Sequence, residues 1–275
     1  ELVAEQDGGW TPIGTEEEPF FGRLDGNGYE ISGLRIDRPE EDYVGLFGDC
    51  RGALVDVTIA DCLVTGDGGV GGLAGAVSVP REDDDSREQP PDAEFRRGVG
   101  RGGSVTGEIT GNGAVGGLVG HALDGTVEDS TASAPISGTS NVGGLIGSED
   151  SCRLQSLEAT GTVRGERVVG GLAGDTNPLE ARNLSANGDV YGKDFVGGLC
   201  GRFDGGGQWR PSADVQRLSA SGNVEGNWRV GGLAGTTKVV TVSEATASGD
   251  VSGNREVGGL VGWASEGEFR NVDAS

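Results

Sequence analysis

The sequence predicts an all-β fold, a right-handed parallel β-helix, from three observations. The pattern Val-Gly-Gly-Leu-x-Gly follows a shortened form at Val44, and most of its recurrences are 27 residues apart. A fixed period of this length is typical of stacked repeats. Apolar residues of successive units align in columns, and apolar and polar residues alternate within short runs, which is the period of a strand. The full pattern begins at Val70, Val115, Val142, Val169, Val196, Val230 and Val257.

Each unit contains three short apolar runs separated by glycine or polar residues, such as 142–147, 157–159 and Val163. We therefore expect about 27 residues and three short strands per coil, and eight to nine coils in all. Coils stacked about 4.8 Å apart together bury the apolar face that one coil cannot bury alone. The right hand is expected because crossovers between parallel strands are right-handed. Glycines such as Gly138 and Gly165 are expected at the corners of the coils.

Residues 1–43 predict an N-terminal capping coil that closes the apolar end of the stack. The sequence Asp25-Gly26-Asn27-Gly28 stands between apolar runs and predicts a tight turn, because Gly and Asn tolerate positive φ. Residues 44–275 predict the β-helix repeats, so the chain is expected to form a single elongated domain.

Two insertions interrupt the period, at about 79–102 and 204–211. Both follow the glycine pattern and precede the next strand, so both are expected to leave the rod at the same corner. Insertions on one side of a solenoid are often its binding loops, although a corner that merely tolerates extra residues gives the same pattern. The candidate binding residues are Glu82, Asp83, Asp84 and Asp85 in the first insertion, and Trp209 and Arg210 in the second.

The chain is strongly acidic, with a net charge of −23, and its only lysines are Lys193 and Lys238. An acid-rich, lysine-poor surface predicts a protein of a salt-loving organism, although a merely acidic protein has the same charge. A nucleic-acid partner is disfavoured, because phosphate contacts need clustered Lys and Arg. No run of 18 apolar residues is present, so no membrane span is expected. The chain starts at Glu1 and ends in the opening of another unit, so we expect a processed form or fragment that continues past Ser275.

The repeats, together with the segment Phe20-Phe21-Gly22-Arg23-Leu24-Asp25-Gly26-Asn27-Gly28-Tyr29-Glu30-Ile31-Ser32-Gly33-Leu34, resemble the GLUG-motif family. The resemblance covers about residues 10–275. It implies a cell-surface or secreted β-solenoid, as found in prokaryotic surface proteins, in adhesin-like proteins and in the non-catalytic part of some immunoglobulin A peptidases. It implies no catalytic residue set. The acidic composition points to a haloarchaeal member.

Few residues suggest chemistry. His121 is the only histidine and is expected to be an exposed turn residue, and no Gly-x-Ser-x-Gly elbow is present. We expect no cofactor and no metal, with Ca²⁺ at Asp83 and Asp85 as the weak alternative to a solvated acidic loop. Cys50 and Cys62 are the only pair considered for a disulfide.

Two further tryptophans are candidates for contact with carbohydrate, and one asparagine is a candidate for glycosylation. Trp228 and Trp263, like Trp209, predict either sugar contacts or packing over coil corners. Asn183 begins the sequon Asn183-Leu184-Ser185 and is a weak candidate for glycosylation.

The first functional hypothesis is a non-enzymatic extracellular or cell-surface β-solenoid with a structural or adhesive role. Its partners are an extracellular or cell-surface protein or glycan, or further copies stacked head to tail in a filament. The alternatives are a carbohydrate-active β-helix enzyme, which needs a groove with paired carboxylates and aromatic residues, and a non-catalytic targeting module of a larger secreted peptidase.

Overall fold

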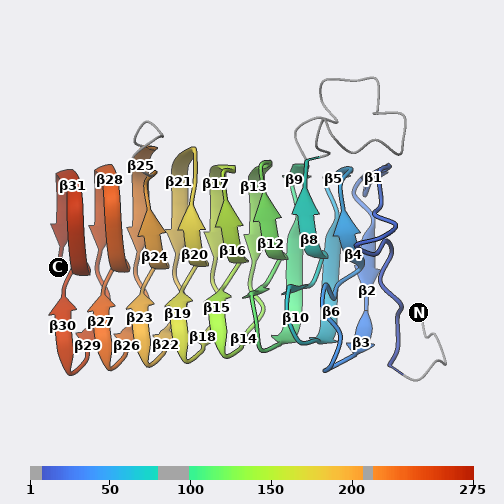
Figure 1. The fold of residues 1–275 in the computed structure, drawn as a ribbon, viewed down its shortest axis with the longest axis horizontal. Coiled ribbons are helices and arrows are strands. Elements are labelled where there is room, and N and C mark those ends of the chain that lie inside the picture. Colours follow the sequence, from blue (N-terminus) through green and yellow to red (C-terminus); the bar gives the residue numbers. More distant parts are fainter. Residues whose placement is uncertain (1–7, 80–98, 207–212) are drawn as a thin grey trace.

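The computed structural model describes residues 8–79, 99–206 and 213–275, and these residues form a rod of stacked coils (Figure 1). Every strand-to-strand pairing between coils is parallel, and the described residues contain no helix. About eight turns follow one another at a spacing of about 27 residues, which confirms the predicted fold class. The N-terminal and C-terminal coils lie at opposite ends of the rod.

A regular coil contains four strand segments, one more than the three apolar runs in its sequence. In the central coil these are β15 (Ser140–Gly143), β16 (Ile146–Asp150), β17 (Arg153–Ala159) and β18 (Val163–Arg164). The extra segment arises inside the repeated pattern itself. Val142-Gly143 ends β15, Gly144-Leu145 forms a bend, and Ile146-Gly147 begins β16. The pattern is therefore a corner between two strands.

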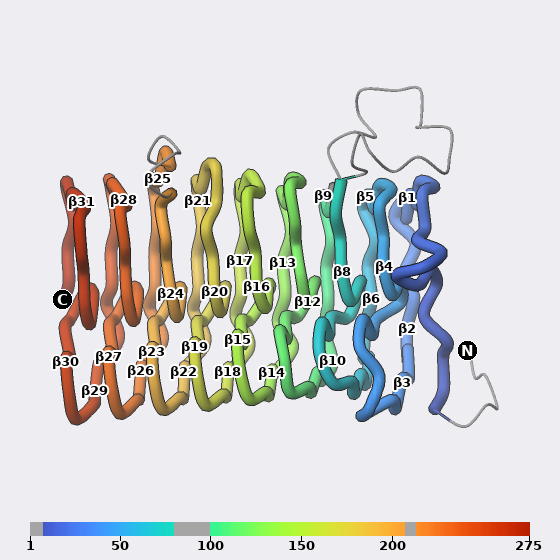
Figure 2. Tube along the Cα trace, viewed as in Figure 1, coloured from blue at the N-terminus to red at the C-terminus, as the bar shows by residue number. Residues whose placement is uncertain are grey.

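The same four segments recur along the rod (Figure 2). The counterparts of β15 form one sheet: β7 (Val70–Gly71), β11 (Val115–Gly116), β19 (Arg167–Gly170), β23 (Asp194–Gly197), β27 (Trp228–Gly231) and β30 (Arg255–Gly258). The counterparts of β16 are β4 (Phe47–Cys50), β8 (Ala74–Ser78), β12 (Val119–Leu123), β20 (Ala173–Asn177) and β24 (Cys200–Asp204). In the last two coils this strand runs on without a break into the next, as β28 (Ala234–Ala247) and β31 (Val261–Ala274).

The remaining strands complete the coils. The counterparts of β17 are β1 (Arg23–Asp25), β5 (Ala53–Val55), β9 (Val99–Arg101), β13 (Thr126–Ala132), β21 (Glu180–Ala186) and β25 (Asp214–Ala220). Those of β18 are β3 (Arg35–Asp37), β14 (Ile136–Ser137), β22 (Val190–Tyr191), β26 (Val224–Glu225) and β29 (Val251–Ser252). In the first coils β2 (Glu30–Ser32) pairs with the first half of β6 (Thr58–Thr65), and β6 and β10 (Ser104–Thr110) run on into the β18 position, where Ile109 pairs with Val64 and Ile136.

The predicted columns are ladders of residues paired across adjacent coils. Val115 pairs with Val142, which in turn pairs with Val169, and the valine column continues to Val257. The leucine column through Leu157 and Leu184 and the alanine column through Ala159 pair in the same way. The inward side chains of these columns are almost fully buried in every coil that has neighbours on both sides. Burying each valine or leucine stabilises the fold by about 1.5–3 kcal/mol relative to leaving it exposed.

Residues with a left-handed backbone conformation also recur at equivalent positions of successive coils. Ser156 (φ 53°), Asn183 (φ 54°) and Arg217 (φ 58°) occupy equivalent places within β17, β21 and β25. At each of them the pairing is interrupted in both coils without a change of register, while the residues on either side stay paired. Because of this interruption both Leu154 and Leu157 are buried in the core.

The glycines of the repeated pattern are required by close approach of neighbouring backbones. A β-carbon on Gly144 would lie 2.1 Å from the carbonyl oxygen of Gly171 in the next coil. A β-carbon on Gly147 would lie 2.4 Å from the backbone nitrogen of Val115 in the preceding coil. Only glycine fits at such contacts.

The N-terminal residues cover the first coil. Gly9, Ile13 and Phe20 form single β-bridges with Ile36, Phe47 and Cys50. The predicted tight turn is present: Asn27 (φ 47°) and Gly28 (φ 76°) occupy its centre, and the Tyr29 N–H donates to the Gly26 carbonyl at 2.8 Å. This is the φ pattern of a type I′ turn.

The opposite end of the rod is open. In the last described coil Val257 is 44% exposed, although its counterparts from Val70 to Val230 are completely buried. Leu260, Phe269 and Val272 are only partly buried against the core. The last described coil therefore leaves apolar side chains and a strand edge of β31 partly exposed.

Candidate functional site

The predicted insertion-loop residues Glu82, Asp83, Asp84, Asp85, Trp209 and Arg210 all lie outside the described residues. The strands that flank the insertions are described. The chain leaves after β8 and returns at β9, and it leaves again after β24 and returns at β25. The described strand ends on either side of both gaps correspond to the end of β16 and the start of β17, so they lie at the same corner of different coils (Figure 2).

A groove of about 630 Å³ lies on the outer face of β4, β8 and β12. Its floor is formed by outward-facing residues at one equivalent position of three adjacent coils. Asp49 pairs with Ala76, and Ala76 pairs with His121. The small Ala76 lies between two larger side chains, and the next small residue, Ser78, also lines the groove. A narrow residue between two wide ones therefore makes a trough across three coils.

Two aromatic rings form one wall. Tyr43 and His121 are 6.1 Å apart between ring centroids, at an angle of 62°. Gly69 in the intervening coil makes this contact possible, because a β-carbon there would lie 2.8 Å from Tyr43 Cδ1 and 3.0 Å from His121 Cδ2. The expectation that His121 is an exposed turn residue was wrong. It belongs to β12 and is half-buried, and burial lowers its pKa, so the neutral imidazole is favoured.

A buried ion pair forms another part of the groove. Asp49 is only 7% exposed, and its Oδ2 accepts a hydrogen bond from Arg51 Nη2 at 3.1 Å. Asp49 Oδ1 is buried and has no hydrogen-bond partner within the described ranges. Burial raises the pKa of this carboxyl, and Arg51 opposes the change. Glu16 and Asp124 line the remaining sides.

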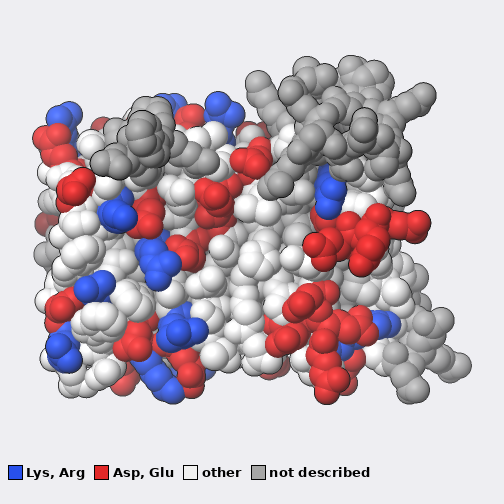
Figure 3. Space-filling model, in the orientation of Figure 1, with Lys and Arg blue, Asp and Glu red and all other residues white. Residues whose placement is uncertain are grey.

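Charge is unevenly distributed over the face shown in Figure 3. Acidic side chains gather over the N-terminal coils, where the groove lies, while acidic and basic side chains are interspersed over the C-terminal coils. The groove itself contributes three carboxylates, from Glu16, Asp49 and Asp124, and one guanidinium, from Arg51. An anionic ligand is therefore disfavoured there.

Trp228 and Trp263 come together around Arg229. The Arg229 guanidinium carbon lies 4.4 Å from the Trp228 ring centroid and 4.5 Å from that of Trp263, and Nε donates to Glu256 at 2.7 Å. Phe195 packs against Trp228, with ring centroids 4.9 Å apart. This aromatic–arginine cluster joins three successive coils. It favours the packing interpretation of the two tryptophans, although Trp263 remains 38% exposed.

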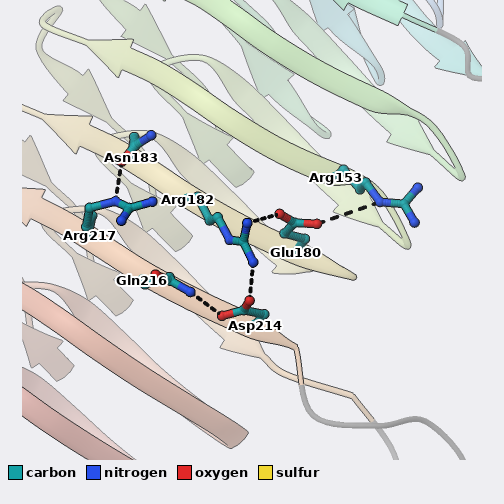
Figure 4. Close-up of polar contacts among 7 residues, drawn as sticks. All are labelled: Arg153, Glu180, Arg182, Asn183, Asp214, Gln216 and Arg217. Carbon is teal, nitrogen blue, oxygen red and sulfur yellow. Dashed lines mark hydrogen bonds and ion pairs between the residues drawn. The ribbon is translucent and has the colours of Figure 1, made fainter.

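Asn183 is exposed on β21, as its place beside the inward Leu184 predicts. Its Oδ1 accepts a hydrogen bond from Arg217 Nε at 2.6 Å (Figure 4). On the same face Arg182 forms ion pairs with Glu180 and with Asp214 of the next coil. Exposed pairs of this kind stabilise a fold by about 0–1 kcal/mol each. Glycosylation of Asn183 stays a prediction.

One carboxylate is buried in the core, and sequence reasoning missed it. Glu149 in β16 is 3% exposed and occupies an inward position that Ala122 and Thr176 fill in the adjacent coils. Its Oε1 accepts from the Cys152 N–H at 2.6 Å, and its Oε2 accepts from Thr176 Oγ1 at 2.6 Å and from the Asn177 N–H at 3.1 Å. Burial raises its pKa to about 7 against the effect of these donors. The sequence signal that could have revealed this buried carboxylate is an acidic residue at a position where the adjacent repeats carry the uncharged Ala122 and Thr176.

Cys50, Cys62, Cys152 and Cys200 are all free and buried, so the suggested Cys50–Cys62 disulfide is wrong. Cys50 lies in β4 and Cys62 in β6, and each packs into the core as a small apolar residue. Within the described ranges no group of three or more His, Cys, Asp or Glu side chains could hold a metal ion. The possible calcium ligands Asp83 and Asp85 lie outside those ranges.

The comparison with known families agrees with the repeat geometry. Residues 111–137 match the family described as the GLUG motif. This span includes β11, the bend after it and β12, and it extends to the end of β14. One repeat of this chain thus matches the GLUG motif, and the other repeats share its Val-Gly-Gly-Leu-x-Gly pattern.

Two proteins of known name resemble parts of this chain in sequence. Halomucin of Haloquadratum walsbyi is 37% identical over 131 residues, which cover 46% of this chain and 1% of that protein. A protein of Evansella cellulosilytica named Putative Gly-rich membrane protein is 50% identical over 40 residues, which cover 14% of this chain and 5% of that protein. The matches therefore span a small fraction of either relative. The first supports the haloarchaeal link expected from composition.

No solved structure matched the chain. Over the ranges that the structure describes, no helix has the length and apolar character needed to cross a membrane.

Proposed function

We propose that this GLUG chain forms a rod-shaped segment of an extracellular or cell-surface protein and has a structural or adhesive role without enzymatic activity. The observation that carries the proposal is the unbroken core, in which one valine ladder runs through every coil from Val70 to Val257. Such a stack gives length and stiffness, since each coil is held by its neighbours. The names of the two relatives, a halomucin and a membrane protein, support a surface location, and neither name denotes an enzyme.

The acidic surface supports the same role in an extracellular medium of high salt concentration. With a net charge of −23, the rod stays hydrated and repels its own copies along its sides where salt is dilute. At an ionic strength of 1 M the Debye length is only about 3 Å, so the repulsion between the sides of neighbouring rods is screened. Contact between coil ends is then the preferred mode of self-association, because the partly exposed Val257, Leu260 and Phe269 are apolar.

The proposal is tested by where the protein lies and what shape it takes. Antibodies against residues 99–206 are expected to label intact source cells, and the purified chain is expected to appear as rods or end-to-end filaments by electron microscopy in multimolar salt. Labelling only after the cells are permeabilised would contradict the surface location. Compact particles in place of rods would contradict the structural role.

The enzymatic alternative has one specific observation in its favour. The groove combines two carboxylates, Glu16 and Asp49, with the rings of Tyr43 and His121. Glycoside hydrolysis needs such a pair, but Asp49 is held by Arg51 and is largely buried. Release of new reducing ends from oligosaccharides, abolished by Glu16→Gln and by Asp49→Asn, would establish the enzyme and overturn the non-enzymatic proposal. We expect no such release.

A further inference from the structure

The groove across β4, β8 and β12 has the properties of a built ligand site. Its volume of about 630 Å³ lies within the range of small-molecule sites, which is about 300–1,000 Å³. It exists because Ala76 and Ser78 are small where the adjacent coils carry Asp49, His121 and Leu123. Further along the rod the same outward ladder carries Ser148, Asp175, Arg202, Thr236 and Trp263.

One polar group in the groove needs a donor. Asp49 Oδ1 is buried and has no hydrogen-bond partner within the described ranges, whereas Oδ2 is paired with Arg51. A buried acceptor left without a partner costs about 1–3 kcal/mol. A ligand that donates a hydrogen bond to this carboxyl removes that cost, so the groove favours a ligand rich in hydroxyl or amine groups.

At the Asp49–Arg51 pair itself, hydroxyl groups fit better than an ammonium group. An ammonium group can only donate, and it would meet the positive guanidinium of Arg51 at the same place. Hydroxyl groups both donate and accept, so neighbouring hydroxyls on one ring suit a carboxylate and a guanidinium side by side. Anionic ligands are disfavoured by the carboxylates of Glu16 and Asp124. The wall formed by Tyr43 and His121 offers aromatic surface to the apolar C–H face of a sugar ring.

We propose that this groove, lined by Tyr43, Asp49, Arg51, Ala76 and His121, binds an uncharged saccharide. The proposal rests on the surface role proposed above and deepens it, because it assigns a glycan as the ligand. Binding takes place without a change in covalent bonds.

The test measures binding of uncharged probes in high salt. We expect the chain to bind at least one of mannotetraose, cellotetraose and galactotetraose by isothermal titration calorimetry, and not to bind sialyllactose or chitotetraosamine. Ala76→Trp fills the floor without removing a wall, and Trp263 shows that the ladder position accepts this side chain. It is expected to weaken binding tenfold or more. Ser148→Trp is the matched control at the same ladder position outside the groove, and is expected to leave the affinity unchanged.

A second variant tests the polar contact with the ligand without changing the shape of the groove. Asp49→Asn preserves volume but replaces one acceptor oxygen by an amide, and it is expected to weaken binding about tenfold in a protein whose thermal unfolding is cooperative. The proposal is overturned if the wild-type chain binds none of the uncharged probes, if Ala76→Trp binds as well as Ser148→Trp, or if only chitotetraosamine binds. Each of these results leaves cell-surface labelling and rod shape untouched, so a failed groove is distinguishable from a failed surface role.

Discussion

Glu149 is the most informative residue to perturb, because its carboxyl is buried between two neighbouring coils. The change is Glu149→Gln, which keeps the side-chain shape and removes the titratable group. Two opposing effects act on the carboxylate: burial disfavours its charge, and the three donors from Cys152, Thr176 and Asn177 favour it. Burial is the larger effect, and it raises the pKa to about 7 from a reference value of 4.5.

The magnitude follows from proton linkage. Since the folded state holds the proton more tightly than the unfolded state, Glu149 lowers the free energy of unfolding as pH rises above 4.5, and the loss is complete above about pH 7. At about 1.4 kcal/mol per pH unit, this interval corresponds to a loss of about 3 kcal/mol. Glu149→Gln lacks this dependence but leaves one backbone donor without an acceptor, which costs about 1–3 kcal/mol at every pH.

The assay is urea unfolding of both proteins between pH 4 and pH 9 in 2 M KCl, where surface repulsion between the many carboxylates is screened. The quantity to compare is the change in unfolding free energy with pH, since the constant cost in the variant then cancels. We expect the wild-type curve to fall by about 3 kcal/mol more than the variant curve. Parallel curves would refute the reasoning, because they would show that the three donors hold the carboxylate ionised throughout.

Three further predictions concern stability. Arg229→Lys keeps the charge but loses the planar stack on two tryptophans, so we expect a loss of about 1–2 kcal/mol in urea unfolding; an unchanged midpoint would show that the cluster is only a surface contact. Gly144→Ala places a β-carbon 2.1 Å from a carbonyl oxygen of the next coil, so we expect little or no folded protein by circular dichroism, and a normal spectrum would contradict the close approach. Val239→Asn replaces a β-branched residue at φ 50°, and we expect a melting temperature a few degrees higher, corresponding to about 1 kcal/mol, whereas a lower one would argue against backbone strain.

The fold was predictable because each coil repeats the same constraints. The valine, leucine and alanine columns were read from spacing alone, and the structure pairs them residue by residue. The division of each coil into four strands was not predicted, since the bend at Gly144-Leu145 lies inside an apolar run that resembles a single strand. The left-handed ladder was also missed, because Ser156 and Arg217 carry no residue-type signal for positive φ.

The groove could not be predicted from the sequence, because its residues are far apart along the chain. Tyr43, Ala76 and His121 become neighbours only when the coil register is known, and the insertion between the second and third coils hides that register. His121 was assigned to a turn because its place after the glycine pattern was read as a corner, whereas that place is the middle of β12. Sequence reasoning instead pointed to the insertion loops, where charged and aromatic residues are adjacent in the chain.

The outward ladder through Asp49 and Ala76 has an evolutionary consequence. Eight equivalent positions on one face carry seven different residue types, while the core ladder of the other sheet is valine in every coil from Val70 to Val257. Surface chemistry can therefore change one coil at a time without disturbing the interior. Duplication of a 27-residue unit would separate two surface features by one more coil spacing, about 4.8 Å, and leave each feature intact. Lineages that carry such repeats can thus vary the distance between recognition features independently of the features themselves.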